Sequence, residues 1–194
     1  PIAAMVRPRA GGFHYTNEEY EVMKQDATML LQEGVEAIVF GFLNEDFTID
    51  ATRTKAFCDL IHRYGGQAVV HRAFDVVQDI DEAMCTLIDC KVDRVLTSGQ
   101  GKTAIVGIET LAYLQNTYGK QIEILGGVGL RADNVKKVLE KTQLQQVHAS
   151  CKTWKRDLTA KAKQVSYGYA NNHELDYECV DKQAVIDFID ALHT

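Results

Sequence analysis

The chain repeats one pattern six times: a short apolar strand ends in polar or glycine residues and then leads into an amphipathic helix. The six strand ends lie at residues 5–9, 39–44, 69–75, 95–99, 124–129 and 147–151. Parallel strands that alternate with helices place all their carboxyl ends on one face, and such folds bind ligands there. We therefore expect polar residues that are far apart in the sequence to meet at one site.

The repeat stops after residue 148. The pattern predicts a long irregular segment over 150–179, which either covers the site or contacts a second subunit, and a closing helix over 181–192. Near the start, Thr16–Glu19 is a capping box that predicts the beginning of the first helix. Because no linker interrupts the pattern, we predict a single partial barrel domain over 1–194.

Composition narrows the function classes. A net charge of −6 over 194 residues argues against a nucleic-acid-binding protein, which needs clustered Lys and Arg. The chain has no apolar run of the ~18 residues that a membrane span needs, so we predict no membrane association. The odd, scattered cysteines favour reduced thiols and a cytoplasmic location. They are Cys58, Cys85, Cys90, Cys151 and Cys179.

Repeated strand–helix units form either an open doubly wound sheet or a closed barrel. The strands here are short and include charged residues such as Glu123, whereas central strands of open sheets are usually continuously apolar. No glycine-rich nucleotide fingerprint follows the first strand, so we expect no nucleotide cofactor. These features favour an α/β, TIM-barrel-like fold of which six of the eight βα units are visible.

Several short motifs resemble the CutC family, whose members are described as copper homeostasis proteins. In order along the chain they occupy residues 5–13, 39–41, 71–75, 93–100 and 147–150. The resemblance implies a TIM-barrel-like fold, a cytoplasmic protein, a homo-oligomer such as a dimer, and copper binding or handling.

The chain departs from the family at its beginning. The resemblance implies two further βα units before the first visible strand, and the cysteines linked to copper lie in those units. No residue of this chain corresponds to them. Copper is therefore implied by the resemblance alone, and the metal ligands stay unknown.

Two arginines close the first strand. Arg7 and Arg9 are two residues apart, which places them on the same side of a strand, and the barrel mouth suits them better than a helix-covered face. Paired guanidinium groups bind carboxylate or phosphate ligands well. The alternative is that these arginines form an internal salt-bridge network with Asp75 and Glu123. The two interpretations, a ligand site and a salt-bridge network, do not exclude each other.

Histidines end two further strands, His71 the third and His148 the sixth. A histidine at this position can act as a general base, bind a metal or a ligand, or form a hydrogen bond within the core. Asp75 could orient His71 or accept a hydrogen bond from Arg72. The candidate catalytic residues are His71, Asp75 and Glu123, and Arg72 and His148 join the candidate ligand-binding residues.

Glycine-rich turns follow two late strands, and such turns can bind phosphate through backbone N–H groups. They contain Ser98 and Gly99 in one turn and Gly126, Gly127 and Gly129 in the other. The alternative is a tight turn that needs glycine only for its backbone shape. Cys151, three residues after His148, could join it on Cu(I) or be an ordinary free cysteine.

Three functions remain open at this stage. The first is a CutC-like protein that binds or handles copper. The second is a barrel enzyme that acts on a small phosphorylated or carboxylated metabolite at the carboxyl-end mouth. The third is a scaffold whose barrel mouth has no activity.

Overall fold

The computed structural model describes residues 1–168 and 172–193. Six strands form the main sheet: β1 (Ala3–Met5), β2 (Ala37–Phe40), β3 (Gln67–Val70), β4 (Arg94–Thr97), β5 (Glu123–Gly127) and β6 (Gln146–His148). Five helices follow the first five strands: α1 (Asn17–Gln32), α2 (Ala51–Arg63), α3 (Ile80–Asp89), α4 (Ile108–Tyr118) and α5 (Val135–Thr142).

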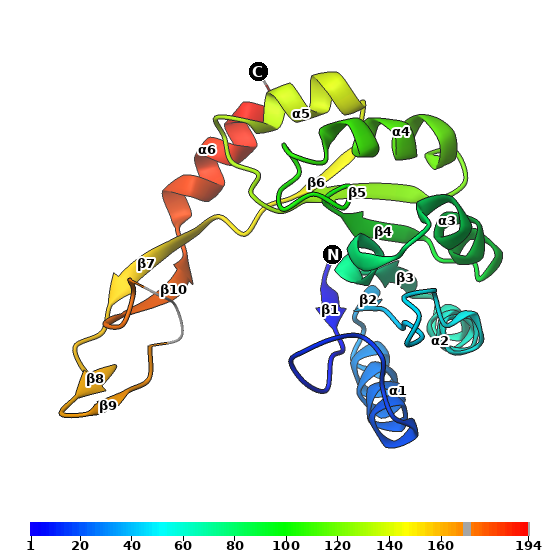
Figure 1. Ribbon diagram of the computed structural model, residues 1–194, viewed down its shortest axis with the longest axis horizontal. Helices are drawn as coiled ribbons and strands as arrows, with labels where there is room; N and C mark the ends of the chain where they lie inside the picture. The colour runs from blue at the N-terminus through cyan, green and yellow to red at the C-terminus, as the bar shows by residue number, and fades with distance from the viewer. Residues whose placement is uncertain (169–171, 194) are drawn as a thin grey trace.

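The sheet is a parallel half-barrel. Its strand order is β1-β2-β3-β4-β5-β6, the same as the order along the chain. A doubly wound sheet would reverse direction at a switch point, whereas sequential winding puts every connecting helix on one side. Figure 1 shows the resulting curl, with the helices along its outer side. The predicted barrel-like fold with six visible units is confirmed.

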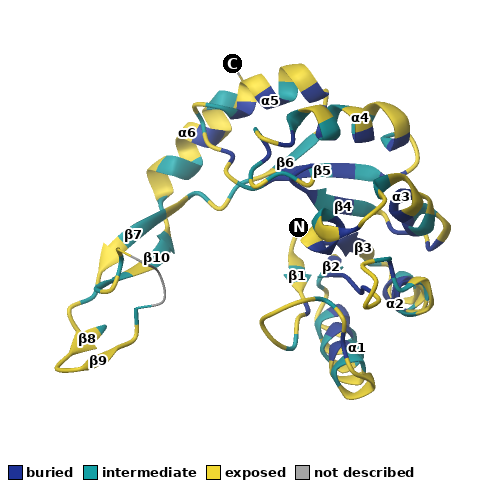
Figure 2. Ribbon diagram, viewed as in Figure 1, coloured by how far each residue is buried: buried dark blue, intermediate teal, exposed yellow. Residues whose placement is uncertain are grey.

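The core lies between the sheet and these helices (Figure 2). Phe40 at the end of β2 packs against Phe57 of α2, with ring centroids 4.7 Å apart, and Phe42 lies 5.2 Å from the same ring. All three rings are buried. Burying a phenylalanine contributes about 1.5–3 kcal/mol, so this cluster fixes α2 on β2 and positions the carboxyl end of that strand.

The inner face of the half-barrel is only partly covered. Along β4 the residues alternate between half-buried and buried, and the half-buried ones, Arg94 and Leu96, belong to the face that carries no helices. Met5 on β1 is 55% exposed. The two edge strands of this sheet are β1 and β6. The inner face of the sheet is therefore partly exposed between these two edges.

The segment 150–179, expected to be irregular, contains four strands instead. β7 (Lys152–Arg156) pairs antiparallel with β10 (Asp176–Val180), and β8 (Lys161–Ala162) pairs with β9 (Val165–Ser166). The sequence does not show the alternation of apolar and polar residues that predicts a strand, because both faces of this arm are rich in polar residues. Residues 169–171, which include part of a Tyr-Gly-Tyr and Asn-Asn stretch, lie outside the described residues.

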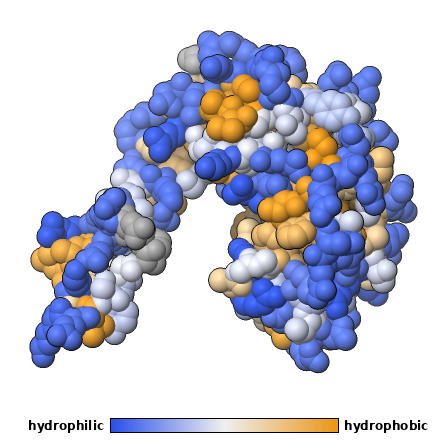
Figure 3. Space-filling view, viewed as in Figure 1, coloured by the Kyte–Doolittle hydropathy of each residue, from blue (hydrophilic) through white to orange (hydrophobic). Residues whose placement is uncertain are grey.

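The closing helix α6 spans Lys182–His193, close to the expected 181–192. Phe188 is its buried residue and belongs to the main core. Figure 3 shows the arm (β7–β10) standing away from the half-barrel, with open space between the two. Within the described residues, no helix combines the length and the apolar character that a bilayer crossing requires.

Candidate functional site

His71 directly follows β3 and is 3% exposed. Its backbone N–H donates to the Phe40 carbonyl, which extends the pairing of β2 and β3 by one residue. Its Nδ1 accepts a hydrogen bond from the Ala73 N–H at 3.1 Å. Burial lowers the pKa of His71 to about 4. The imidazole is therefore neutral at pH 7, and its proton is on Nε2.

Gly41 makes room for this imidazole. In the register of β2 and β3, Val39 pairs with Val69, which places Gly41 opposite His71. A Cβ atom at Gly41 would lie 2.7 Å from Cε1 of His71 and 2.9 Å from Cβ of Ala73. Only glycine leaves the space that the ring needs to lie across the end of β2.

Phe13 and Arg7, from the loop after β1, lie near His71, and Tyr15 of the same loop packs on Phe42. The ring of Phe13 lies 4.6 Å from the imidazole, and the Arg7 guanidinium lies 4.9 Å from the Phe13 ring centroid. Arg7 also donates to the Gly11 carbonyl at 2.5 Å. Tyr15 is buried, and burial raises the pKa of its hydroxyl although the charge of Arg7 opposes this shift. This group joins the ends of β1 and β3.

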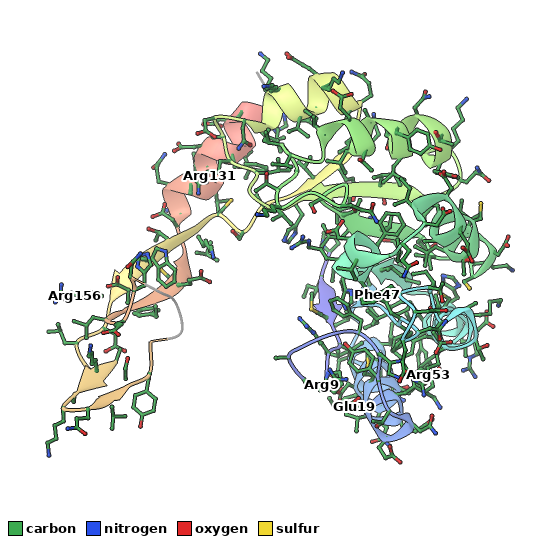
Figure 4. All side chains as sticks on the ribbon, in the orientation of Figure 1. Arg9, Glu19, Phe47, Arg53, Arg131 and Arg156 are labelled. Carbon is green, nitrogen blue, oxygen red and sulfur yellow. The ribbon has the colours of Figure 1, made fainter. Side chains whose placement is uncertain are left out.

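Arg9 has different polar partners from Arg7, although its guanidinium also lies 5.0 Å from the centroid of the Tyr15 ring. Its Nε donates to Glu19 at 2.5 Å, and its other nitrogens donate to carbonyls of the loop, including that of His14 at 2.6 Å. Figure 4 shows Arg9 and Glu19 side by side, away from the arm. β1 ends at Met5, so strand alternation no longer applies at Arg9. The two arginines therefore differ in their partners: Arg7 donates to the Gly11 carbonyl, and Arg9 forms an ion pair with Glu19.

Asp75 fills the turn that follows β4. Its carboxylate accepts from the Thr97 hydroxyl at 2.6 Å, and from the Ser98 N–H and hydroxyl, each at 3.0 Å. Arg72 donates to the same carboxylate at 2.6 Å and to the Ser98 hydroxyl at 3.3 Å. The side chain of Asp75 is only 5% exposed. The donors expected to bind an external anion are therefore engaged by the protein's own carboxylate.

The neighbouring Gly99 also has an internal partner, since its N–H donates to the Thr97 hydroxyl at 2.9 Å. Glu123, the third candidate catalytic residue, is the first residue of β5. It forms an ion pair with Arg94 at 2.5 Å, and Arg94 is in register with Val69, two residues before His71. Glu123 therefore lies toward the amino ends of the strands, and the structure does not bring it to the mouth.

The second glycine-rich turn lies at the other side of the sheet. Gly126 and Gly127 belong to β5, and Gly129 follows with a φ of +73°. Gly127 is in register with the exposed His148 on β6. β4 and β5 separate β6 from β3, so His148 and His71 occupy different parts of the mouth. Their roles as ligand-binding residues stay predictions.

Two features are absent from the sequence-based candidates. Tyr15 lies two residues after the motif that ends at Phe13, and the burial of its hydroxyl is visible only in the folded chain. Pairing of β7 with β10 also brings Cys151 near Cys179. Cys179 is opposite Thr153, and a 2.8 Å hydrogen bond from Asp181 N–H to the Cys151 carbonyl continues the ladder.

The fold is a partial α/β barrel with polar residues at the carboxyl ends of its strands. Comparison with known proteins places it further. The chain matches the sequence model of the CutC family over residues 1–153. It is 33% identical to a CutC protein of Vibrio campbellii over 194 residues, which is all of this chain and 78% of that protein. The chain belongs to the CutC family.

Two further relatives agree. A CutC protein of Mesorhizobium japonicum is 46% identical over 149 residues, which cover 76% of this chain and 57% of that protein. The crystal structure of a CutC protein from Streptococcus agalactiae, described as a copper homeostasis protein, superimposes with a TM-score of 0.71 at 28% identity. It covers 76% of this chain and 71% of that chain. The chain thus spans only part of the length of each of these relatives.

Proposed function

We propose that this protein takes part in copper homeostasis by binding or handling copper. The observation that carries the proposal is membership of the CutC family, together with the likeness to the Streptococcus agalactiae protein. The alternative, an enzyme that acts on a small anionic metabolite, has no comparable support. In this proposal copper is the cargo that the protein binds and passes on, and it is not a resident cofactor.

The described residues contain no group of three or more His, Cys, Asp or Glu side chains that could hold a metal ion. A closed, multi-ligand copper centre therefore does not fit this part of the chain. Soft thiolates are the ligands that Cu(I) prefers. Cys151, which directly precedes β7, and Cys179 on the neighbouring strand β10 are both half-buried and free. This pair supports a low-coordinate Cu(I) contact, with His148 three residues before Cys151.

The test is an anaerobic Cu(I) titration against a competing chelator. We expect Cys151→Ser and Cys179→Ser each to weaken Cu(I) binding at least tenfold, because each removes one of two soft ligands. Cys85→Ser is the matched control, since Cys85 is exposed and lies on α3. No measurable Cu(I) binding by the unsubstituted chain, or equal binding by all variants, would refute the assignment of these thiols.

We further propose a homodimer in the cytoplasm, with the arm as a contact surface. The arm carries exposed apolar side chains: Leu158 is 71%, Tyr167 80% and Val180 68% exposed. An isolated two-stranded ribbon is marginal in water, so a partner surface would stabilise it. The five free cysteines support a reducing compartment.

Analytical ultracentrifugation tests the dimer. Leu158→Asp with Tyr167→Asp is expected to raise the dimer dissociation constant at least tenfold. Val106→Asp is the control, because Val106 is equally exposed at 70% but lies before α4, outside the arm. A monomeric parent chain, or a dimer that only Val106→Asp disrupts, would show that the arm is not the interface.

A further inference from the structure

Two buried polar atoms at the barrel mouth have no hydrogen-bond partner. They are the hydroxyl of Tyr15 and Nε2 of His71, and they are the only such side-chain atoms among the described residues. Tyr15 is 2% and His71 3% exposed. Folding normally pairs every buried donor, and an unpaired one in a native protein points to a water or ion that completes it.

Both atoms are hydrogen-bond donors. Nδ1 of His71 accepts from the Ala73 N–H, which leaves the single proton of the neutral ring on Nε2. The Tyr15 hydroxyl keeps its proton at neutral pH because burial disfavours the phenolate. In the structure neither proton has an acceptor.

Arg7 adds positive charge beside these donors. Its guanidinium lies 4.9 Å from the centroid of the Phe13 ring, and that ring lies 4.6 Å from the ring of His71. The charge of Arg7 also acts to lower the pKa of both His71 and Tyr15. Its guanidinium is exposed and uses one N–H on the Gly11 carbonyl. Glu19, on α1, is paired with Arg9, whose guanidinium lies 5.0 Å from the Tyr15 ring centroid. The charges of that pair cancel, so Arg7, which has no ion-pair partner among the described residues, leaves a net positive charge beside the two neutral donors.

We propose that Arg7, Tyr15 and His71 form a binding site for an oxyanion, the carboxylate or phosphate group of a small ligand. Such a group accepts hydrogen bonds only, which matches three donors with no competing acceptor. Arg7 supplies the charge, and the Nε2–H of His71 and the hydroxyl of Tyr15 bind the oxygens. The site is independent of the copper proposal and shares none of the cysteines.

Phe13 closes the site in this structure. Its ring lies 4.6 Å from the His71 ring and beneath the Arg7 guanidinium at 4.9 Å. An oxyanion therefore reaches the donors when the loop of residues 8–14 moves aside. Gly11, with a φ of +98°, and the exposed Gly12 provide backbone freedom for that movement.

Other anion-binding candidates of the mouth are already used. Arg9 is bound to Glu19, and the donors of Ser98 are bound to Asp75. Tyr15 and His71 differ from these residues because both are buried and neither has an acceptor for its proton in the structure.

Isothermal titration with inorganic phosphate, and in parallel with acetate, tests the proposal. We expect saturable binding of at least one anion, and which one binds distinguishes a phosphate from a carboxylate ligand. Arg7→Gln is expected to weaken binding at least tenfold and Tyr15→Phe about fivefold. Arg131→Gln, which removes one exposed positive charge after β5, is expected to leave the affinity within twofold.

Tyr15→Phe also separates a binding role from a structural one. Removing an unpartnered hydroxyl should leave the thermal midpoint without ligand unchanged or higher, while it lowers anion affinity. As a second readout, the anion should shift the ¹⁵N resonance of His71 Nε2 in the unsubstituted protein. No binding of either anion at 50-fold molar excess, or equal affinity in all variants with a silent Nε2 signal, would overturn the proposal.

Discussion

At the residue scale, the mouth of the half-barrel depends on how His71 is buried. The imidazole is packed between Gly41 and Phe13 and keeps its neutral form because charging it would place a cation in a nearly water-free environment. The lowered pKa of His71 thus depends on its packing against two residues, Gly41 and Phe13, that carry no polar side chain.

This burial makes folding stability depend on pH. The pKa of His71 is 6.5 as a reference and about 4 in the folded chain, so between these values only the unfolded state takes up the proton. The contribution of His71 is full above pH 6.5 and declines by about 3 kcal/mol as pH falls to 4. Urea denaturation should show a flatter pH dependence for His71→Gln over this window. Parallel curves for the two proteins would contradict the assignment.

Gly41 offers a second test at this scale. Gly41→Ala places a methyl group 2.7 Å from the imidazole, so we expect a loss of about 1–3 kcal/mol in the free energy of unfolding. Gly12→Ala is the control, because nothing lies within 4 Å of its added Cβ, and it should change stability by less than about 0.5 kcal/mol. Equal effects of the two substitutions would mean that His71 does not pack against β2.

At the element scale, a carboxylate connects two strand ends. Asp75, in the short helical turn Arg72–Val76 after β3, binds Thr97 and Ser98 at the end of β4. The Asp75 carboxylate occupies the donors of that turn, and its hydrogen bonds hold the ends of β3 and β4 together.

Asp75→Asn should therefore destabilise the protein by about 3 kcal/mol, because an amide cannot accept every one of these bonds and leaves Arg72 without its partner. Chemical denaturation measures this. Glu45→Gln, at a side chain that is 87% exposed, should cost less than about 0.5 kcal/mol. A small effect of Asp75→Asn would indicate that the turn holds its shape without the carboxylate.

Sequence patterns predict the start of α1 but not the strands of the arm. The capping box at Thr16 is present as expected, with the Thr16 side chain on the Glu19 N–H and the Glu19 side chain on the Thr16 N–H. The sequence does not predict the strands of the arm, because they are short and mostly polar. They show no alternation of apolar and polar residues that would indicate a strand. Strand pairing over 20 residues of separation is a tertiary property that local patterns do not encode.

At the scale of the whole molecule, repeated strand–helix units were enough to predict a curled parallel sheet, and the CutC motifs identified the family. The same motifs did not reveal which candidates meet. Glu123 pairs with Arg94 and Ser98 with Asp75, while Arg7 and His71 both lie against Phe13. Charge pairing inside the fold decides which donors remain for a ligand, and a sequence alone does not show it.

We propose that an oxyanion and copper contact different parts of this CutC chain: the oxyanion binds at the ends of β1 and β3, and copper binds at the end of β6 and on the arm. One set of histidine ¹⁵N spectra tests it, recorded with phosphate and then with Cu(I) under anaerobic conditions. We predict that phosphate shifts His71 Nε2 and leaves His148 unchanged, whereas Cu(I) changes His148 and leaves His71 unchanged. Cu(I) perturbing His71, or phosphate perturbing His148 alone, would contradict this division of the barrel mouth.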